Sequence, residues 1–436
     1  MVGLNDYGSR FQTNGGPGVH PEKYRKSKLD MLELYLAAAI VFFAPLNFLR
    51  HPSFYMTVSD LFVMACILVM LVNRTLPLRP FEALAPVWMT SILMIIAGLM
   101  LGSIINGDPT RGLVVTGQYF FALFVLPLVL VARPWGQLIL LIKVFVLSIV
   151  ISCLAGVYFI HIDGETNTVF VSGNGRWRSF MERTNSAASV FAMTIPLVIW
   201  LAEQRLVRKT VAMVTFLIIL YGLMLTGSNT GILAALFGLG FYFLISITWA
   251  RFFIGLGLMI ATVVIVGAWG EYFLPEVFQR RVLGSLESGN LEQAGTFVDR
   301  VELILEALRF SNGTIFLGFG ADQYSKISSH GAPVHNAYLL LLTEGGLLGL
   351  SGFLLLMIVW FTVPFVNRRP GSSLLTPLIC VCIASVFAAM ANGTAHFYAR
   401  FWMIPITLAL AISIAMTRFG DVPEDLRVKR FARRRR

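Results

Sequence analysis

Two histidines, His330 and His335, lie near the end of the longest polar stretch of the chain. Directly after His335 the sequence becomes apolar, with Asn336, Ala337 and Tyr338 followed by four leucines. His335 is therefore expected where water meets a bilayer. An imidazole titrates near neutral pH, so at this depth it can exchange protons and still face a lipid-embedded substrate. We take His335 as the candidate catalytic base.

Arginines are the second group of side chains that could do chemistry. They are Arg176, Arg178 and Arg183 in a polar loop of about 162–184, and Arg300 in a second loop of about 271–335. A guanidinium group binds two phosphate oxygens at once through parallel hydrogen bonds. Two arginine-bearing loops and one histidine, all expected on the same side of the membrane, are therefore candidates for one site.

The segment around Arg300 predicts a helix. Thr296 and Asp299 have the spacing of a capping box that opens an amphipathic segment. Its apolar face is expected to hold Val301, Ile304, Leu305 and Leu308, with Glu302 and Glu306 on the other face and Arg300 on the border. This helix is expected to lie on the membrane surface or to pack on the transmembrane bundle.

The elements that position these residues are apolar. Of 436 residues, 57% are hydrophobic and 13% charged, and the mean hydropathy is +0.76, which predicts an integral membrane protein. Apolar runs near spanning length occur at about 31–49, 54–73, 86–106, 112–132, 137–161, 185–202, 210–227, 230–248, 252–270, 346–366, 374–392 and 401–417. We therefore predict an all-α fold of about twelve transmembrane helices with a large, partly helical periplasmic loop.

Basic residues set the predicted topology. They collect in every second connection and in the tail that ends with Arg433–Arg436, so both termini are expected in the cytoplasm. This bias also explains the net charge of +11 without any nucleic-acid partner. The predicted organisation is a tail of residues 1–30, a membrane domain of residues 31–417, and a basic tail of residues 418–436.

Glycines interrupt the apolar run from 336 to 366, which is too long for one straight span. Gly345 and Gly346 are expected to permit a kink or close helix packing. Glu344 lies inside the same run, where a carboxylate is a functional candidate. The bonding alternatives for Glu344 are Thr343 and a neighbouring helix terminus.

Several chemical signals are missing from the sequence. There is no Walker loop, no outward pair of carboxylates with DxD spacing and no clustered His/Cys motif, so we expect neither a cofactor nor a metal. The four cysteines all lie in apolar runs, which argues against a disulfide framework.

These residues resemble the O-antigen ligase and polysaccharide polymerase superfamily of bacterial membrane glycosyltransferases. The family motif is a His followed by Asn, Ser or Gln, nine residues, and GxxG. It is matched here by His335-Asn336, the residues 337–345, and Gly346-Leu-Leu-Gly349. Arg300, near the start of an amphipathic segment, also resembles a family arginine. So does the first loop, with Arg176-Trp177-Arg178 before Asn185.

The resemblance implies transfer of a whole glycan from an undecaprenyl-diphosphate carrier to an acceptor sugar such as lipid A-core, at the periplasmic face of the bacterial inner membrane. Such a transfer needs a base for the acceptor hydroxyl and cations for the leaving diphosphate. The expected base is His335. The expected binding residues are Arg300, Arg178, Arg176, Arg183, Asn336 and His330, with His330 on the acceptor side. The expected reaction is metal-independent and inverts the anomeric centre.

Two other functions stay open at this point. One is a polymerase of the same superfamily that joins the repeat units of a surface polysaccharide. The other is a secondary transporter, for which paired ionisable residues near the midplane and related halves would be expected. Asp60 and Lys143 are the main candidates for such a pair, and no convincing internal repeat is found.

Overall fold

The computed structural model describes residues 28–50, 55–245, 297–366, 368 and 372–428, with short stretches between 253 and 279. The described helices are α1 (Lys28–Phe43), α2 (Val58–Asn73), α3 (Ala85–Asn106), α4 (Pro109–Phe120), α5 (Leu126–Leu130), α6 (Trp135–Val157), α7 (Thr184–Glu203), α8 (Lys209–Leu225), α9 (Asn229–Ile245), α11 (Glu276–Phe278), α13 (Phe297–Ser311), α14 (Tyr324–Ile327), α15 (Ala337–Thr362), α16 (Leu375–Ala391) and α17 (Arg400–Phe419). Two π-helical segments continue helices, at Phe121–Val125 between α4 and α5 and at Tyr158–Ile162 after α6. Short 3-10 turns lie at Asn47–Leu49, Glu82–Leu84, Ser179–Met181 and Glu424–Leu426.

Six helices of the described part are long and apolar enough to cross a membrane. They are Glu82–Asn106, Pro109–Leu130, Trp135–Ile162, Thr184–Glu203, Ala337–Thr362 and Arg400–Phe419. The mostly helical architecture is confirmed, with no strand among the residues described. The count of about twelve spans and the sidedness of the loops stay predictions, and most of the expected span at 252–270 lies outside the described residues.

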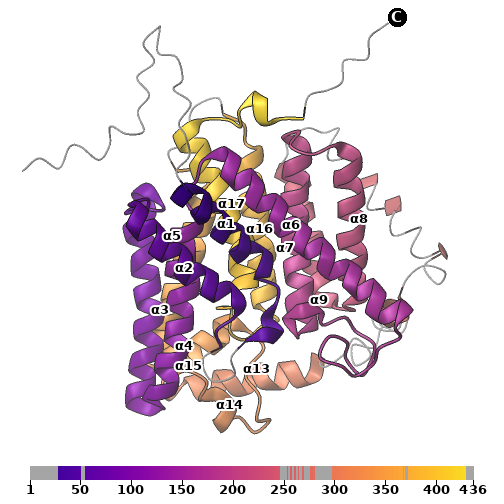
Figure 1. Ribbon diagram of the computed structural model, residues 1–436. Coiled ribbons are helices and arrows are strands. Elements are labelled where there is room, and N and C mark those ends of the chain that lie inside the picture. The colour runs from indigo at the N-terminus through magenta and orange to yellow at the C-terminus, as the bar shows by residue number, and fades with distance from the viewer. Residues whose placement is uncertain are drawn as a thin grey trace, which may run out of the picture.

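The helices lie side by side in a bundle, and α13 lies across one end of it (Figure 1). The innermost element is α17, in which every residue from Arg400 to Met416 is buried. A helix that is apolar and buried on all sides belongs at the centre of such a bundle. Outer helices instead expose large apolar side chains, such as Leu61, Leu68 and Val72 on α2, as expected for surfaces that face lipid.

The glycines of the motif shape α15. Gly346 has φ 65° and ψ −167°, a left-handed conformation that breaks the helix, so the predicted kink is confirmed. The break frees backbone groups, and the preceding chain satisfies them. The Thr343 and Glu344 carbonyls accept hydrogen bonds from the backbone N–H groups of Phe319 (2.8 Å) and Gly320 (2.9 Å), while Leu347 N–H donates to Ile315 O (2.7 Å). Irregular backbone at membrane depth requires such partners.

Close packing of α3 against α15 is the second consequence of these glycines. A Cβ atom added to Gly98 of α3 would lie only 2.5 Å from the Gly345 carbonyl oxygen and 2.6 Å from Gly349 N. Small residues let two helix backbones approach in this way, as in other membrane bundles. The GxxG motif therefore fixes the position of α15 and of the loop before it.

Helix α13 packs on the bundle through a stripe beside the predicted apolar face, with Ile304 at the border of the two. Leu303 and Ala307 are buried in a cluster with Tyr324, Val334 and Ala395, whereas the predicted face residues Val301, Leu305 and Leu308 are exposed. Both sets are apolar and adjacent on the helix, so the 3.6-residue period alone could not decide between them. The buried face brings α13 beside the residues that precede α15 and α17.

Candidate functional site

A cavity of about 960 Å³ opens among the ends of several helices. Its lining includes His335, the first-loop arginines Arg176, Arg178 and Arg183, and residues from the segment Gly393–Trp402. Helices α7, α15 and α17 all begin here, because Thr184 and Arg400 open α7 and α17 and His335 lies two residues before Ala337, the first residue of α15. The start of a helix carries partial positive charge and free N–H groups. The cavity is therefore suited to an anionic ligand.

The first loop is anchored by Trp177. Its side chain is fully buried and stacks on Phe159 at 5.9 Å, and its backbone N–H donates to Leu225 O (2.9 Å). The Gly156 position leaves space for the indole, because a Cβ there would lie 2.9 Å from the ring. The arginines on either side of Trp177 both line the cavity, so the buried ring holds two guanidinium groups at one wall.

The three first-loop arginines differ in what they contact. Arg176 Nε donates to the Thr226 carbonyl oxygen (2.8 Å), and Arg178 makes a long contact of 3.4 Å with Thr168 O. Arg183 is exposed. Within the described part of the chain, neither Arg178 nor Arg183 forms an ion pair with a carboxylate. Their positive charges are therefore available to a ligand.

Three further arginines line the cavity that the sequence interpretation did not include. Each is paired with a carboxylate: Arg50 with Glu182 (3.2 Å), Arg111 with Asp322 (2.6 Å) and Arg400 with Asp60 (2.5 Å). A signal for them existed in the sequence. All three lie at the ends of apolar runs, in connections predicted to be outside, where the charge bias gives no reason for a basic residue.

His335 is placed by the start of α15. The neighbouring Asn336 caps the helix, since its side-chain oxygen accepts hydrogen bonds from the N–H groups of Tyr338 and Leu339, both at 3.1 Å. The Asn336 amide nitrogen reaches Asn392 Oδ1 at 3.5 Å. His335 itself is half-buried and lines the cavity. Asn336, for which a binding role is predicted, therefore also has a structural role as a helix cap. That role occupies its side-chain oxygen.

Of the other two predicted residues, only the side chain of His330 belongs to the described part of the structure. His330 does not line the cavity, and its Nε2 lies 3.8 Å from Glu302 Oε2. Arg300 lies in the first turn of α13, but its side chain, like Thr296, is outside the described part.

Glu306 ties α13 to the segment before His335. Its carboxylate accepts hydrogen bonds from Tyr324 OH (2.9 Å), Ser328 Oγ (2.6 Å) and Ser329 N–H (2.8 Å). Burial acts to raise the pKa of Glu306, but the hydrogen bonds from the two serines and Tyr324 bring it down to about 2. The carboxylate is thus ionised at neutral pH and holds α13 in place.

Residues 214–354 match the family model described as O-antigen ligase. The chain is thus similar to O-antigen ligases over this segment. This confirms the resemblance drawn from the motif, because the matched segment runs from α8 through most of α15 and includes Arg300, His335 and the kink at Gly346. No curated protein matches the sequence.

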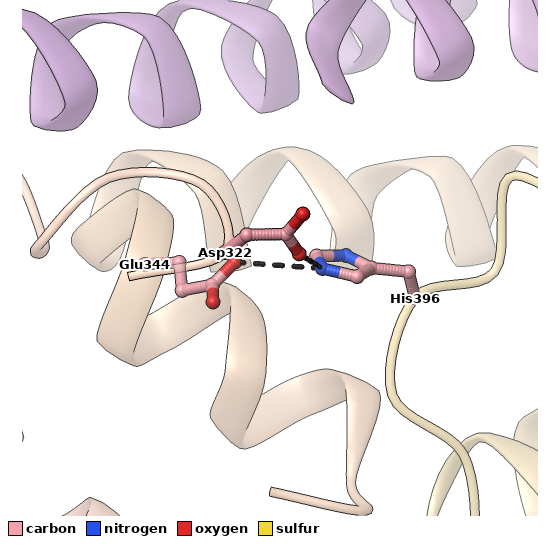
Figure 2. A group of neighbouring side chains, drawn as sticks. All are labelled: Asp322, Glu344 and His396. Carbon is pink, nitrogen blue, oxygen red and sulfur yellow. Dashed lines mark hydrogen bonds and ion pairs between the residues drawn. The ribbon is translucent and has the colours of Figure 1, made fainter. Parts of the chain in front are cut away.

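A second cluster of titratable groups adjoins the O-antigen ligase motif. Asp322, Glu344 and His396 point toward one another from three separate segments, and their nearest ligand atoms all lie within 4.8 Å (Figure 2). Asp322 and His396 line the cavity, and Glu344 lies behind them. The sequence predicts no metal site here, because 74 residues separate Asp322 from His396. The spacing of the three residues along the chain therefore could not predict this cluster.

Charge pairing shifts the ionisation of two members of this cluster. Burial acts to raise the pKa of Asp322, but its hydrogen bond with His396 and the charges of His396 and Arg111 bring the pKa to about 2. Burial acts to lower the pKa of His396, and its hydrogen bond to Asp322 and the charges of Glu344 and Asp322 raise it overall. The oppositely charged side chains of Asp322 and His396 therefore stabilise each other at the cavity wall.

Proposed function

We propose that this protein transfers a glycan as one unit from an undecaprenyl-diphosphate carrier to an acceptor sugar, with His335 as the base. The observation that carries the proposal is that His335 shares one cavity with Arg178 and Arg183, which have no carboxylate partner among the described residues. The match of residues 214–354 to the O-antigen ligase family model supports the same class of reaction, that of a membrane glycosyltransferase acting on lipid-linked glycans.

The proposed step is a single displacement at the anomeric carbon. The imidazole of His335 accepts the proton of the acceptor hydroxyl, whose oxygen forms the new bond to the anomeric carbon. The bond between that carbon and the diphosphate oxygen breaks, and the diphosphate leaves with its electron pair. Attack opposite the leaving group inverts the anomeric centre. No oxidant or nucleotide is needed for this step.

The leaving diphosphate gains negative charge as the bond breaks. Guanidinium groups stabilise such charge best, because they stay protonated and bind two oxygens in a fixed plane. We assign this role to Arg178 and Arg183, with Arg176 and Arg300 as further candidates. The helix starts at Thr184 and Arg400 add partial positive charge to the same cavity.

The acceptor assignment is part of the proposal. We favour a ligase that acts on a lipid A-core or similar acceptor at the periplasmic face of the inner membrane, with both termini in the cytoplasm. A transporter gains no support from its two candidate residues, since Asp60 pairs with Arg400 and Lys143 is exposed. A polymerase of the same superfamily would use the same cavity with a second lipid-linked glycan as acceptor.

The test is transfer by the purified protein from a lipid-linked glycan, offered lipid A-core and a second glycan carrier in separate reactions. Wild-type protein should extend the lipid A-core. Replacing His335 by Ala should lower transfer by at least about a hundredfold, since a positioned base contributes on the order of 10²–10⁴. Replacing His161 by Ala is the matched control and should leave transfer within about twofold, because His161 contacts Tyr221 and lies outside the cavity lining.

Two results would contradict the proposal. Transfer above a few per cent in well-folded His335→Ala protein would exclude the base assignment. Extension of the second glycan carrier alone would replace the ligase by a polymerase.

A further inference from the structure

The cluster of Asp322, Glu344 and His396 has the composition of a metal site. It offers two carboxylates and one imidazole, and Figure 2 shows the three side chains meeting at one point. His396 Nε2 lies 2.6 Å from Asp322 Oδ1 and 3.7 Å from Glu344 Oε2. Ligands to one cation need this kind of convergence, and a small movement would open the Asp322–His396 contact around an ion.

Hydrogen bonding among the three side chains does not explain why the Glu344 carboxylate is buried. Its side chain is 1% exposed, and neither carboxylate oxygen accepts a hydrogen bond within the described part of the chain. The predicted partner Thr343 instead donates to Leu340 O (3.0 Å). The backbone N–H groups of Asp322 and Tyr324 lie nearby. A buried carboxylate without a hydrogen-bond donor is costly even with an imidazole at 3.7 Å, and a bound cation would remove that cost.

The neighbours of the other two side chains are arranged as outer partners of metal ligands usually are. Arg111 Nε holds Asp322 Oδ2 at 2.6 Å and leaves Oδ1 directed at His396. Tyr119 OH lies 3.3 Å from His396 Nδ1, so a proton on Nδ1 would leave the Nε2 lone pair for a cation. Such outer contacts orient ligands and choose the imidazole tautomer.

The backbone of the site is fixed independently of any ligand. The kink at Gly346 lets the Glu344 carbonyl accept the Gly320 N–H, which brings the segment before Asp322 against α15. Ala321 N–H also donates to Ser103 Oγ of α3 (2.9 Å). Two of the three candidate ligands are therefore held in register by main-chain contacts.

We propose that Asp322, Glu344 and His396 bind one divalent cation at the cavity wall. Mixed imidazole and carboxylate ligation suits Mn²⁺ or Zn²⁺ better than Mg²⁺ or Ca²⁺, which prefer oxygen alone. Binding would displace the proton shared by Asp322 Oδ1 and His396 Nε2. Asp322 and His396 border the cavity, which gives the ion a route of entry. The proposed metal site does not depend on the proposed glycan transfer. It differs from the expectation, drawn from the sequence, that the protein binds no metal.

The test is direct binding of Mn²⁺ to the full-length protein purified in detergent and stripped with EDTA. Free Mn²⁺ is followed by electron paramagnetic resonance, with Zn²⁺ as competitor and Mg²⁺ as the weaker comparison ion. Wild-type protein should bind about one Mn²⁺ per chain. Asp322→Asn, Glu344→Gln and His396→Gln should each weaken binding by at least about tenfold, the scale of losses at metal sites. Glu302→Gln is the control, because this exposed carboxylate lies outside the cluster.

Each variant is checked by size-exclusion chromatography and thermal unfolding before binding is measured. Absence of bound Mn²⁺ and Zn²⁺ in wild-type protein would overturn the proposal, whatever the variants do. So would equal binding by folded Glu344→Gln protein, which would mean that the trio shares protons only. Neither result bears on His335, so the two proposals fail separately.

Discussion

Five of the arginines that line the cavity fall into two groups that differ in their partners. Arg50, Arg111 and Arg400 each pair with a carboxylate, whereas Arg178 and Arg183 pair with none in the described residues. The first group joins segments far apart in the chain, such as α2 to α17 through Asp60 and Arg400. The second group projects from one loop beside the buried Trp177.

The paired arginines therefore stabilise the cavity, whereas the unpaired arginines are available to bind a substrate. A guanidinium group already neutralised by a carboxylate has little charge left for a phosphate, and moving it would leave a buried acid unpaired. An unpaired guanidinium group costs the fold little to replace but matters to an anionic ligand. Replacements in the first group should therefore change stability, and replacements in the second group should change transfer.

The largest effect is expected for Arg400→Ala. Arg400 and Asp60 are 4% and 1% exposed, and Arg400 also donates to Gln118 Oε1 (2.8 Å). Removing one partner of a buried pair costs about 3–5 kcal/mol, because the other charge stays buried alone. Reversible unfolding in mixed micelles should show a loss of this size. The double variant Arg400→Met/Asp60→Leu should recover most of it, and a loss below about 1 kcal/mol in the single variant would contradict the assignment.

Arg178→Lys should mainly lower transfer. The ammonium keeps the charge but loses the two-pronged contact with a diphosphate. A charge-assisted contact contributes about 1.5–3 kcal/mol, so transfer from a lipid-linked glycan should fall roughly ten- to a hundredfold. Arg178→Ala should be about equally impaired, with the unfolding midpoint unchanged for both. Normal transfer by Arg178→Lys protein would move the diphosphate away from the first loop.

Arg300 extends the comparison to α13. If it joins the second group, Arg300→Lys should reduce transfer by about tenfold, the loss of one such contact. Arg309 is the matched control, since it is exposed on the same helix and forms no ion pair with Glu302 or Glu306 in the described structure. Arg309→Ala should transfer normally. A stronger defect in Arg309→Ala than in Arg300→Lys would remove α13 from the proposed site.

The smallest effect is expected for Arg50→Ala, the most exposed member of the first group. Arg50 and Glu182 are 35% and 26% exposed, and solvent weakens such pairs to about 0–1 kcal/mol. Unfolding should shift by no more than this amount, and transfer should stay within about fivefold. A hundredfold loss of transfer with normal stability would place Arg50 among the substrate-binding arginines and end the division into two groups.

Much of the helical framework could be predicted because apolar runs of spanning length leave few alternatives. The kink in α15 was also predictable, since Gly345 and Gly346 interrupt a run too long for one span. The sequence alone did not show which stripe of α13 packs on the bundle, because two adjacent stripes are apolar and only packing against Val334 and Ala395 distinguishes them.

The candidate site was predicted in part for a related reason. His335 and the arginines of the first loop stand out locally, by type and by position at the edge of apolar runs. Asp322 and His396 do not, because their relation is a contact across 74 residues. That contact depends on how closely α3 packs on α15, and no local pattern in the sequence specifies it.

The kink at Gly346 also bears on how relatives of this chain should be recognised. The histidine and the glycines of the motif are required for different reasons. Gly346 and Gly349 are required by a left-handed backbone and by the close approach of Gly98, whether or not any reaction occurs. A related protein that no longer catalyses the reaction could therefore vary at the position of His335 and still retain both glycines. Matching glycines report shared architecture, and only the histidine with its arginines can report retained chemistry.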